Sequence, residues 1–357
     1  MRVLIVCSEA PPVVSGVARS VGELAIGLRA RGHDVDVLSA ADAWGVRKDR
    51  FRLSGAGLGV LARTKRDGPY DVVNVHGPSP SISDLALLEL LFSTQSPAVV
   101  YTHHFPMHFG TPVLDQLGNL YDRSVRRLAA RCSYVVATSQ HYAEHFRKRH
   151  RRVAVIPWGT GPALPKGCSR TYDGSQPLRV LAVGQFRKYK GMAVLVSAVL
   201  GVESVQLTLV GDGPTISSVR SQVPAGARNV HFAGRVGDSE LEDLYWQSDV
   251  SALPSTTRAE AFGIVLLEGM AHGCVPVASD LPGVAEVVGT TGRLATPGDH
   301  LSLRRVLIDL AEDPDQVEVR KQLGLERVEH YSWGRVVESY EAIFSDVVDR
   351  RAARVTR

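Results

Sequence analysis

The sequence predicts an α/β protein with two doubly wound parallel sheets, each flanked by helices. Apolar runs of strand length alternate with segments of helical periodicity along the whole chain, and one stretch rich in proline and glycine divides this alternation in two. The 357 residues also suit two domains, since compact domains commonly hold about 150 residues. We therefore expect two similar domains joined by a linker.

The first domain is expected over residues 1–160. Its opening run RVLIVCS has the length of a buried strand, and HDVDVLSA gives a second strand. Between them Val17, Val21, Leu24 and Leu28 recur at helical spacing, and Gly32 stands where a helix commonly ends. Further strands are expected at YDVVNVHG, AVVYTHH, SYVVATS and VAVIPWG, and helices over about 83–92, 113–131 and 140–149.

The linker is expected over residues 161–177, because residues 157–177 hold four prolines and four glycines and cannot form a regular element. The alternation restarts with RVLAVGQ and continues through VQLTLVGDG, NVHFAGR, DVSALPS and CVPVASD, which predicts a second domain over 178–332. The closing segment carries Val336, Tyr340, Ile343, Phe344 and Val347 at helical spacing. It predicts a helix over about 333–350 that can cross back onto the first domain.

Charge is unevenly spread. Residues 1–157 carry 20 Lys and Arg against 13 Asp and Glu, and the rest carry 21 against 24, so the net charge of +4 is the sum of +7 and −3. The basic half is either a solvated face or a surface that attracts anionic membrane or a phosphorylated acceptor. Nucleic acid is not an expected partner, because the basic runs contain no interleaved aromatic residues.

Composition bears on compartment and redox state. No apolar run reaches the roughly 18 to 20 residues that span a bilayer, and the apolar stretch at the N-terminus is too short for a signal peptide, so we expect a cytoplasmic protein. Peripheral contact at the inner face of the membrane is the accompanying expectation. Cys7, Cys132, Cys168 and Cys274 lie far apart, which indicates reduced core thiols rather than disulfides or a zinc site.

The most informative segment is PSTTRAEAFGIVLLEGMAHGCVPV, residues 254–277, which holds Glu260 and Glu268. Residues 263–273 are apolar on nearly all sides, so Glu268 is a carboxylate in a buried helix that needs partners. Glu260 precedes the helix in a loop, and the N–H groups of Phe262, Gly263 and Ile264 would lie at its positive end. These residues form a site for an anion and for hydroxyl groups, or they have structural roles only. In the second case Glu260 caps the helix and Glu268 is a core carboxylate bonded to backbone amides.

The spacing in EAFGIVLLE, with LPS before it and GMAHGCVPVAS after it, resembles the family 4 retaining glycosyltransferases of GT-B fold. The resemblance extends from SGVARSVGELAIGLRARGHDVDVLS to YSWGRVVESYEAIF. It implies that Glu268 binds the ribose of a nucleotide sugar and that Glu260 contacts the transferred sugar. Phe262 and Gly263 would offer backbone donors.

The loop after RVLAVGQ carries three cations, of which Arg187 and Lys190 are the candidates for the phosphates. Cleaving a sugar from a nucleoside diphosphate builds negative charge that fixed cations stabilise. The family pattern has Arg where this chain has Gln185, so either Arg187 supplies the cation or Gln185 binds phosphate more weakly. Gly211, within VQLTLVGDG, is a further candidate for substrate binding.

Two candidates come from the first domain. Gly16 follows Ser15 at a helix start, where backbone can approach phosphate or acceptor closely, although a turn glycine is the alternative. The glycine cluster GAGLG at 55–59 follows no clear strand, so a nicotinamide site is not expected. In the resembling family a histidine at the end of the strand AVVYTHH lies beside the sugar, and alignment favours His103 over His104. Zinc binding by His103, His104 and His108 is not expected, because no nearby carboxylate or cysteine completes the set of ligands.

The resemblance, together with these residues, implies a retaining glycosyltransferase. The donor is a nucleotide-diphosphate sugar held mainly by the second domain, and the acceptor is a sugar, a lipid-linked or a small molecule held mainly by the first. No metal or other cofactor is expected, because DVD lies in a predicted strand and DPD follows a helix near residue 314. The alternatives are a nucleotide-sugar epimerase of the same fold and a non-catalytic nucleotide-binding scaffold.

Overall fold

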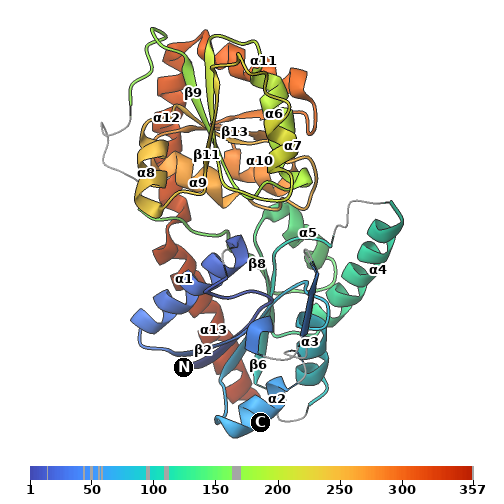
Figure 1. Cartoon of the computed structure of the whole chain (residues 1–357). Helices are drawn as coiled ribbons and strands as arrows, with labels where there is room; N and C mark the ends of the chain where they lie inside the picture. The colour runs from blue at the N-terminus through green and yellow to red at the C-terminus, as the bar shows by residue number, and fades with distance from the viewer. Residues whose placement is uncertain are drawn as a thin grey trace. The chain divides into compact units, whose positions relative to one another are not determined.

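The chain divides into two compact units, one of Met1–Gly159 with Trp333–Arg357 and the other of Thr160–Ser332 (Figure 1). The computed structural model describes residues 1–13, 15–42, 45–48, 51–54, 57, 59–93, 97–107, 112–162 and 170–355. Cys168, His108, residues 163–169 of the expected linker and residues 55–56 and 58 of GAGLG lie outside the described part.

The first unit contains a six-stranded parallel sheet in the order β2-β1-β5-β6-β7-β8. The strands are β1 (Arg2–Val6), β2 (Asp34–Leu38), β5 (Val72–Gly77), β6 (Ala98–His103), β7 (Tyr134–Ala137) and β8 (Val153–Val155). The helices are α1 (Gly16–Ala30), α2 (Val60–Arg66), α3 (Ser83–Leu91), α4 (Pro112–Ala129), α5 (Gln140–Arg147) and α13 (Trp333–Val355), with a short 3-10 turn η1 (Ala40–Asp42). All six strands predicted from the apolar runs are confirmed.

Local sequence explains how the first helix begins and ends. Ser15 caps α1 by accepting a hydrogen bond from the N–H of Ala18 at 3.1 Å, and Gly32 follows the last turn with a φ of +87°. Of the apolar stripe that the spacing predicted, Val21, Leu24 and Leu28 are fully buried, and Val17 is partly buried against the same core.

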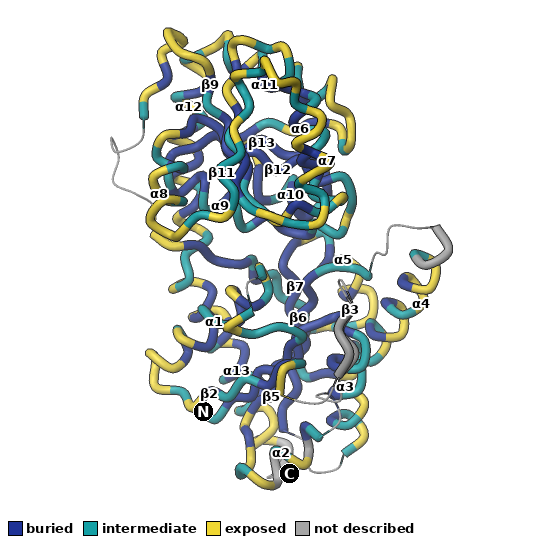
Figure 2. The backbone as a smooth tube through the Cα atoms, viewed as in Figure 1, coloured by how far each residue is buried: buried dark blue, intermediate teal, exposed yellow. Residues whose placement is uncertain are grey.

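The strands of the first sheet are covered on both faces, and Figure 2 shows them buried beneath helices whose outer sides are exposed. Leu24 of α1 and Tyr340 of α13 pack on the face that Ile5 and Val100 line. The other face carries α3, α4 and α5. The buried positions of α13 include every apolar residue from which the closing helix was predicted: Val336, Tyr340, Ile343, Phe344 and Val347.

One element of the first unit was not predicted. Strands β3 (Gly45–Lys48) and β4 (Phe51–Ser54) form an antiparallel hairpin separate from the main sheet. The statement that no strand precedes GAGLG is therefore wrong, because β4 ends at Ser54. That strand belongs to the hairpin and not to a β-α-β unit, which is the context that a dinucleotide site requires.

The second unit repeats the architecture with a parallel sheet in the order β11-β10-β9-β12-β13-β14. The strands are β9 (Leu178–Val183), β10 (Val205–Val210), β11 (Val230–Gly234), β12 (Val250–Leu253), β13 (Val275–Ser279) and β14 (Arg293–Ala295), the last of which was not predicted. The helices are α6 (Met192–Val199), α7 (Ile216–Arg220), α8 (Asp238–Trp246), α9 (Ile264–Ala271), α10 (Pro282–Val288), α11 (His300–Ala311) and α12 (Pro314–Val328), with 3-10 turns η3 (Lys188–Lys190) and η4 (Glu329–Tyr331).

Two residues of the expected linker, Arg170 and Tyr172, pack within the second unit. The Tyr172 side chain is buried and its hydroxyl donates to the carbonyl of Ala311 at 2.9 Å. Beside it lies a buried charge cluster in which Lys321 Nζ contacts Asp249 Oδ1 at 3.1 Å and Arg170 Nη1 contacts Asp249 Oδ2 at 2.5 Å. Lys321 and Asp249 are both fully buried, so the cluster ties this segment to β12 and α12.

Three cysteines that the sequence marked as core thiols are free and buried, namely Cys7, Cys132 and Cys274. Burial raises the pKa of Cys7 and of Cys274 to about 12, so both thiols stay protonated at neutral pH. The prediction of reduced core thiols is confirmed for these three residues.

Candidate active site

The loops after β9 and β12 approach each other closely at Gly191. Gly191 has a φ of +69°, and a Cβ atom built there would lie 1.9 Å from the carbonyl oxygen of Pro254. A backbone hydrogen bond of 2.7 Å from Thr256 N–H to Tyr189 C=O joins the same two loops. The cationic loop and the loop that carries Glu260 are thereby held side by side.

This packing brings together two predicted residues that are 70 positions apart in the sequence. Lys190 Nζ lies 2.5 Å from Glu260 Oε2, and the Ser255 hydroxyl donates to the same oxygen at 3.0 Å. The two charged side chains are only 16% and 12% exposed, so the pair is shielded from water on most sides. A cation and a carboxylate thus lie together at the end of the sheet, where parallel α/β sheets bind ligands.

Gln185 and Arg187 also lie together. Arg187 Nε donates to Gln185 Oε1 at 2.9 Å, with Gln185 exposed and Arg187 half-buried. The guanidinium therefore stands beside the residue that replaces the family's arginine. This geometry places a permanent cation close to the position where the resembling family has one.

Gly211 shapes the end of the sheet by backbone packing. It has a φ of +122°, and a Cβ atom there would lie 2.0 Å from the carbonyl oxygen of Gly184. Its N–H donates to the carbonyl of Gly234 at 2.6 Å. The ends of β9, β10 and β11 therefore approach closely just before Gln185.

Helix α9 starts without a side-chain cap. Its N-cap residue Gly263 has left-handed backbone with a φ of +86°, and the Phe262 side chain before it is buried and lies 6.3 Å from the Tyr331 ring. Because the first N–H groups of a helix have no intrahelical acceptor, the backbone at Phe262, Gly263 and Ile264 suits an anion or a sugar oxygen.

Glu268 projects from α9 and is half-buried, with buried Leu267 and Gly269 on either side in the sequence. The hydroxyl of Tyr245, on α8, donates to Glu268 Oε2 at 3.2 Å. The ring of His272 stacks on Tyr245 at 5.1 Å between centroids. The carboxylate is therefore oriented, as a site for paired hydroxyl donors requires. Sequence reasoning missed Tyr245 and Ser255, since neither stands at a distinctive spacing from the glutamates.

The two candidates in the first unit have different surroundings. Gly16 begins α1 directly after its Ser15 cap. The His103 ring is buried in an aromatic pocket, 5.0 Å from Phe146 and 5.8 Å from Tyr142, and burial lowers its pKa to about 3. The role of His103 at a sugar stays a prediction, and its surroundings are those of a core residue.

His104 follows the strand and faces the other way. Its Nε2 lies 3.0 Å from His76 Nδ1, and its ring stacks on Trp158 at 5.1 Å. Burial lowers the pKa of His104 to about 3 as well. Because side chains alternate along a strand, residues 103 and 104 cannot share one environment.

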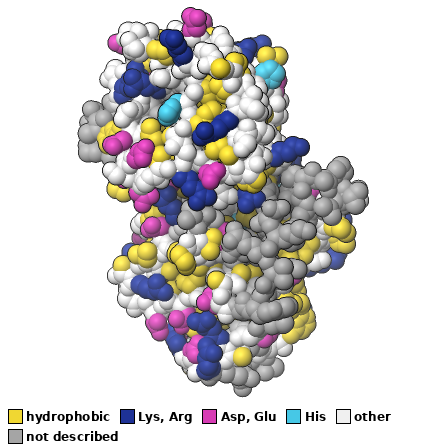
Figure 3. Space-filling view, viewed as in Figure 1, with side chains coloured by type: hydrophobic (Ala, Val, Ile, Leu, Met, Phe, Trp, Pro, Cys, Tyr) yellow, Lys and Arg dark blue, Asp and Glu magenta, His cyan; other side chains and the backbone are white. Residues whose placement is uncertain are grey.

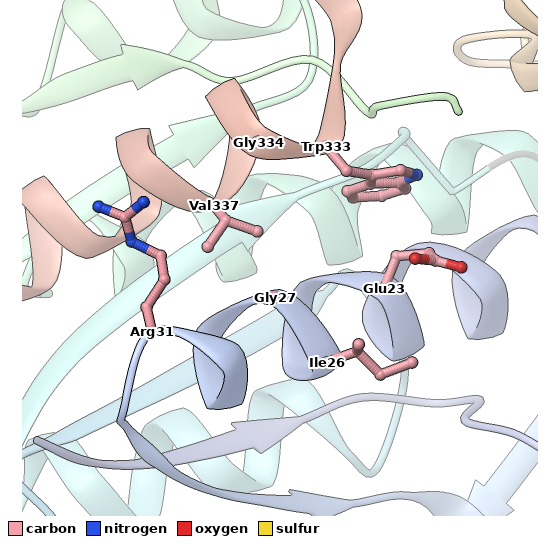
Figure 4. A pocket seen from close by; sticks show the side chains of 7 residues that line it. All are labelled: Glu23, Ile26, Gly27, Arg31, Trp333, Gly334 and Val337. Carbon is pink, nitrogen blue, oxygen red and sulfur yellow. The ribbon is translucent and has the colours of Figure 1, made fainter. Parts of the chain in front are cut away.

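A separate cavity of about 240 Å³ lies in the first unit, along the facing sides of α1 and α13 (Figure 4). Its lining includes Ile26, Trp333 and Val337, with Glu23 and Arg31 beside them. None of the sequence-predicted site residues lines it.

One carboxylate of DVD and one of DPD have structural partners. Asp34 forms an ion pair with Arg2, and Asp313 caps the N-terminus of α12.

Comparisons with known proteins find glycosyltransferases. A model of the group 1 glycosyl transferases matches residues 177–313, and a model of Glycosyltransferase Family 4 matches residues 14–163. A phosphatidyl-myo-inositol mannosyltransferase of Mycobacterium tuberculosis is 30% identical over 97% of this chain and 97% of its own length. A D-rhamnosyltransferase of Pseudomonas aeruginosa is 31% identical over 70% of this chain and 66% of its own length.

Solved structures show the same fold. A sucrose-phosphate synthase from Thermosynechococcus elongatus has a TM-score of 0.75 at 20% identity and covers 98% of this chain and 99% of its own. Anabaena HepE, in complex with UDP, has a TM-score of 0.71 at 18% identity over 97% of this chain and all of its own. With its two parallel-sheet units and its match to full-length relatives, the chain belongs to the group 1, family 4 glycosyltransferases of GT-B fold.

Proposed function

We propose that the second unit binds the nucleotide-diphosphate sugar and that Lys190 stabilises the departing diphosphate. The observation that carries this proposal is the contact of Lys190 with Glu260, which precedes the N-cap residue Gly263 of α9 in the same loop. In this arrangement the Lys190 ammonium and the Arg187 guanidinium face developing negative charge, and Glu260 accepts hydrogen bonds from hydroxyl groups of the transferred sugar.

The other candidates complete the donor site in this proposal. Glu268, oriented by Tyr245, accepts hydrogen bonds from the ribose hydroxyls. Gln185 lies beside Arg187 at the phosphates, and the N–H groups at Phe262, Gly263 and Ile264 receive phosphate or sugar oxygens. Anabaena HepE, whose structure holds UDP, supports a nucleoside diphosphate as the leaving group.

The proposed reaction is hexosyl transfer with retention of configuration. The anomeric bond to the diphosphate breaks, the acceptor oxygen bonds to the same carbon, and the acceptor proton passes to a leaving phosphate oxygen. Mannosyltransferases and a D-rhamnosyltransferase are among the relatives, so these sugars are the first to test. The acceptor is a sugar, a lipid-linked or a small-molecule alcohol, and the basic first unit with Gly16 holds it. No metal is required in this proposal.

The experiment is a thermal-shift series with UDP, GDP, ADP and dTDP, followed by the corresponding mannosyl, rhamnosyl and glucosyl donors. One nucleotide should raise the melting temperature of the wild type, and Glu268→Gln should abolish that shift. Turnover of donor only in the presence of an acceptor supports transfer. Turnover without an acceptor would instead favour an epimerase, and nucleotide binding with no turnover would favour a scaffold.

We further propose that the first unit contacts anionic membrane through α4. Leu117 and Leu120 are each 58% exposed on this helix, and Arg123 and Arg127 are exposed on its next turns. Figure 3 shows hydrophobic and basic side chains close together at the edge of the first unit. Exposed leucines beside arginines are typical of a helix that lies in a lipid interface. Among the described residues no helix is long and apolar enough to cross a membrane.

Co-sedimentation with vesicles tests this contact. The wild type should bind vesicles that contain phosphatidylglycerol and not vesicles of phosphatidylcholine alone, and the double change Leu117→Ser and Leu120→Ser should reduce binding at least fivefold. Leu301→Ser is the matched control, because Leu301 is 57% exposed on α11 of the other unit. Equal binding by all three proteins would refute a role for α4.

A further inference from the structure

Helices α1 and α13 pack side by side in the first unit and face each other in a regular register. Gly27 lies against Val337, because a Cβ atom built on the glycine would be 2.4 Å from Val337 Cγ2. One turn later, Arg31 Nε lies 2.6 Å from Glu341 Oε2. Each of these pairs is 310 positions apart in the sequence. Because residues four apart lie on one face of a helix, the two helices match turn by turn.

The turn before these two pairs brings a carboxylate opposite an indole. The same register places Glu23 of α1 opposite Trp333 of α13, and both residues line the cavity of about 240 Å³ between the helices. Figure 4 shows the Glu23 carboxylate and the Trp333 ring at one end of this cavity and Arg31 at the other. The cavity therefore has two chemically different ends.

The lining of the cavity carries one negative charge that is not compensated. Arg31 is paired with Glu341, and His33 Nε2 contacts the same glutamate at 2.8 Å. Glu23 forms no ion pair and no side-chain hydrogen bond with any other residue that the structure describes. Because an unpaired carboxylate that is partly shielded from water attracts a cation, a positively charged ligand complements this end of the cavity.

The Trp333 ring is held beside this carboxylate by the chain that precedes the second unit. The Gly159 backbone packs against the ring, since a Cβ atom built on Gly159 would lie 2.8 Å from Trp333 Cδ2. The Trp158 ring lies 6.1 Å from the same indole. Among aromatic side chains, the indole attracts an organic cation most strongly. A fixed indole and an unpaired carboxylate at one end of a cavity are the two parts of a site for an ammonium group.

Gly334 keeps this end of the cavity open. Its backbone is not left-handed, and a Cβ atom built there would meet no atom within 4 Å, so neither conformation nor packing requires glycine. Glycine is less favourable than alanine in a helix, and here its effect is to leave space. Ile26, which is 61% exposed, and Val337 add apolar surface to the lining. The cavity thus combines apolar walls with a net negative charge.

We propose that the cavity between α1 and α13 binds a small organic ammonium ion, with the charged nitrogen between the Glu23 carboxylate and the Trp333 ring and the carbon substituents against Ile26. Pockets for drug-sized ligands measure roughly 300–1,000 Å³, so this smaller cavity suits a small amine. The inference does not depend on the proposed transfer reaction, because no residue proposed for the donor lines the cavity.

Titration of the full-length protein with choline tests the site. The control ligand is the uncharged analogue of choline in which a carbon atom replaces the nitrogen. The indole N–H signal of Trp333, assigned with Trp333→Phe, follows binding in ¹H–¹⁵N NMR spectra. We expect a saturable shift with choline and an affinity for the uncharged analogue at least about fivefold weaker. Equal affinity for the two ligands, or no saturable shift with choline, would overturn the inference.

The carboxylate is tested by Glu23→Gln, which removes the charge and keeps the shape of the side chain. Choline affinity should fall about fivefold or more. Glu338→Gln is the matched control, because Glu338 is exposed on α13 and does not line the cavity, and it should bind choline within about twofold of the wild type. Equal weakening by the two changes would show attraction to general surface charge and would refute a site at Glu23.

The cavity itself is tested by Gly334→Leu, which fills it from the start of α13. Because an added Cβ atom meets no neighbour, the variant should melt no lower than the wild type, whereas choline binding should be lost. Gly334→Ala leaves most of the space and should bind choline within about threefold of the wild type. A folded Gly334→Leu protein that binds choline as the wild type does would contradict the proposal. If this variant does not fold, the comparison of Glu23→Gln with Glu338→Gln still decides.

Discussion

Lys190 Nζ lies 2.5 Å from Glu260 Oε2, across two loops that follow different strands of the second sheet. Without a donor, the positive charge of Lys190 and the negative charge of Glu260 neutralise each other. In the proposed reaction, a diphosphate beside Lys190 would compete for the ammonium, and Glu260 would then be available to sugar hydroxyls. We therefore propose that the contact links the phosphate end of the donor with its sugar end.

Removal of the Lys190 charge should act on catalysis and on stability. In Lys190→Met we expect turnover to fall about 10²- to 10³-fold, since a fixed electrostatic stabiliser of the leaving group is lost. Of the partners Lys190 and Ser255, Glu260 then keeps the Ser255 hydroxyl. The free energy of unfolding should therefore fall by about 1–3 kcal/mol. Steady-state kinetics and urea unfolding measure the two effects.

Lys188→Met provides the control for this change. Lys188 is exposed in the same 3-10 turn, so its loss removes one positive charge from the loop without breaking a shielded pair. We expect turnover within about threefold of the wild type. If Lys188→Met and Lys190→Met were equally impaired, general loop charge and not the Glu260 contact would explain the result.

The orientation of Glu268 by Tyr245 predicts a graded effect on donor affinity. Tyr245→Phe removes the hydroxyl that donates to Glu268 Oε2 and should weaken nucleotide binding about 3- to 10-fold, as for one lost hydrogen bond. Glu268→Gln, which replaces one acceptor oxygen with a donor, should weaken it more. Isothermal titration with the preferred nucleoside diphosphate gives both constants, and unchanged affinity in Glu268→Gln would remove Glu268 from the ribose site.

The buried charge cluster should matter for stability and not for the reaction. Asp249→Asn removes the fully buried carboxylate that pairs with both Lys321 and Arg170 and leaves Lys321 with Glu318, 2.9 Å away, so we expect a loss of about 3 kcal/mol in the free energy of unfolding. Asp309→Asn breaks the more exposed pair with Arg293 and should cost less than about 1 kcal/mol. Comparable losses in the two variants, measured by urea unfolding, would contradict the account of the cluster.

Buried histidines set the acid limit of stability. Burial lowers the pKa of His103 and His104 to about 3, whereas an unfolded histidine titrates near 6.5. Each therefore contributes stability that is present above about pH 6.5 and is lost as the pH falls toward 3, because the unfolded chain takes up the proton. The slope is about 1.4 kcal/mol per pH unit for each histidine.

His103→Phe tests this pH dependence, since a phenyl ring suits the pocket of Tyr142 and Phe146. The variant should lose less stability than the wild type between pH 6.5 and 5, as measured by urea unfolding at each pH. His231→Gln changes an exposed ring on β11 and serves as control. The same pH profile in His103→Phe and the wild type would show that His103 does not contribute to the acid limit.

Sequence reasoning succeeded where a local pattern decides the outcome. Continuous apolar runs predicted the six strands of the first sheet, and a 3.6-residue period predicted α13, because burial on one face imposes both patterns. The hairpin β3–β4 was missed, since GVRK and FRLS carry too few apolar residues to stand out. Strand β14 has three residues, which is too short for a periodicity to appear.

The residues of the candidate site were predicted from the sequence, but the contacts between them were not. Glu260 and Lys190 were both identified, but their pairing depends on the close approach of Gly191 to Pro254, which no local pattern encodes. The position of the two histidines at the end of the strand favoured His103 as the site residue. In the structure His104 lies on the face of the sheet that carries polar side chains, and His103 lies on the other face. The neighbours of each histidine depend on the register of β5 against β6, which cannot be read from the sequence of one strand.

We infer that this chain transfers a sugar from a nucleotide-diphosphate donor with retention of configuration. The most direct measurement is ¹H NMR of the anomeric proton during reaction of the wild type and Lys190→Met with the preferred donor and an alcohol acceptor. We expect a glycoside with the donor's anomeric configuration, formed at least 100-fold more slowly by Lys190→Met. A product of inverted configuration, or equal rates for the two proteins, would contradict it.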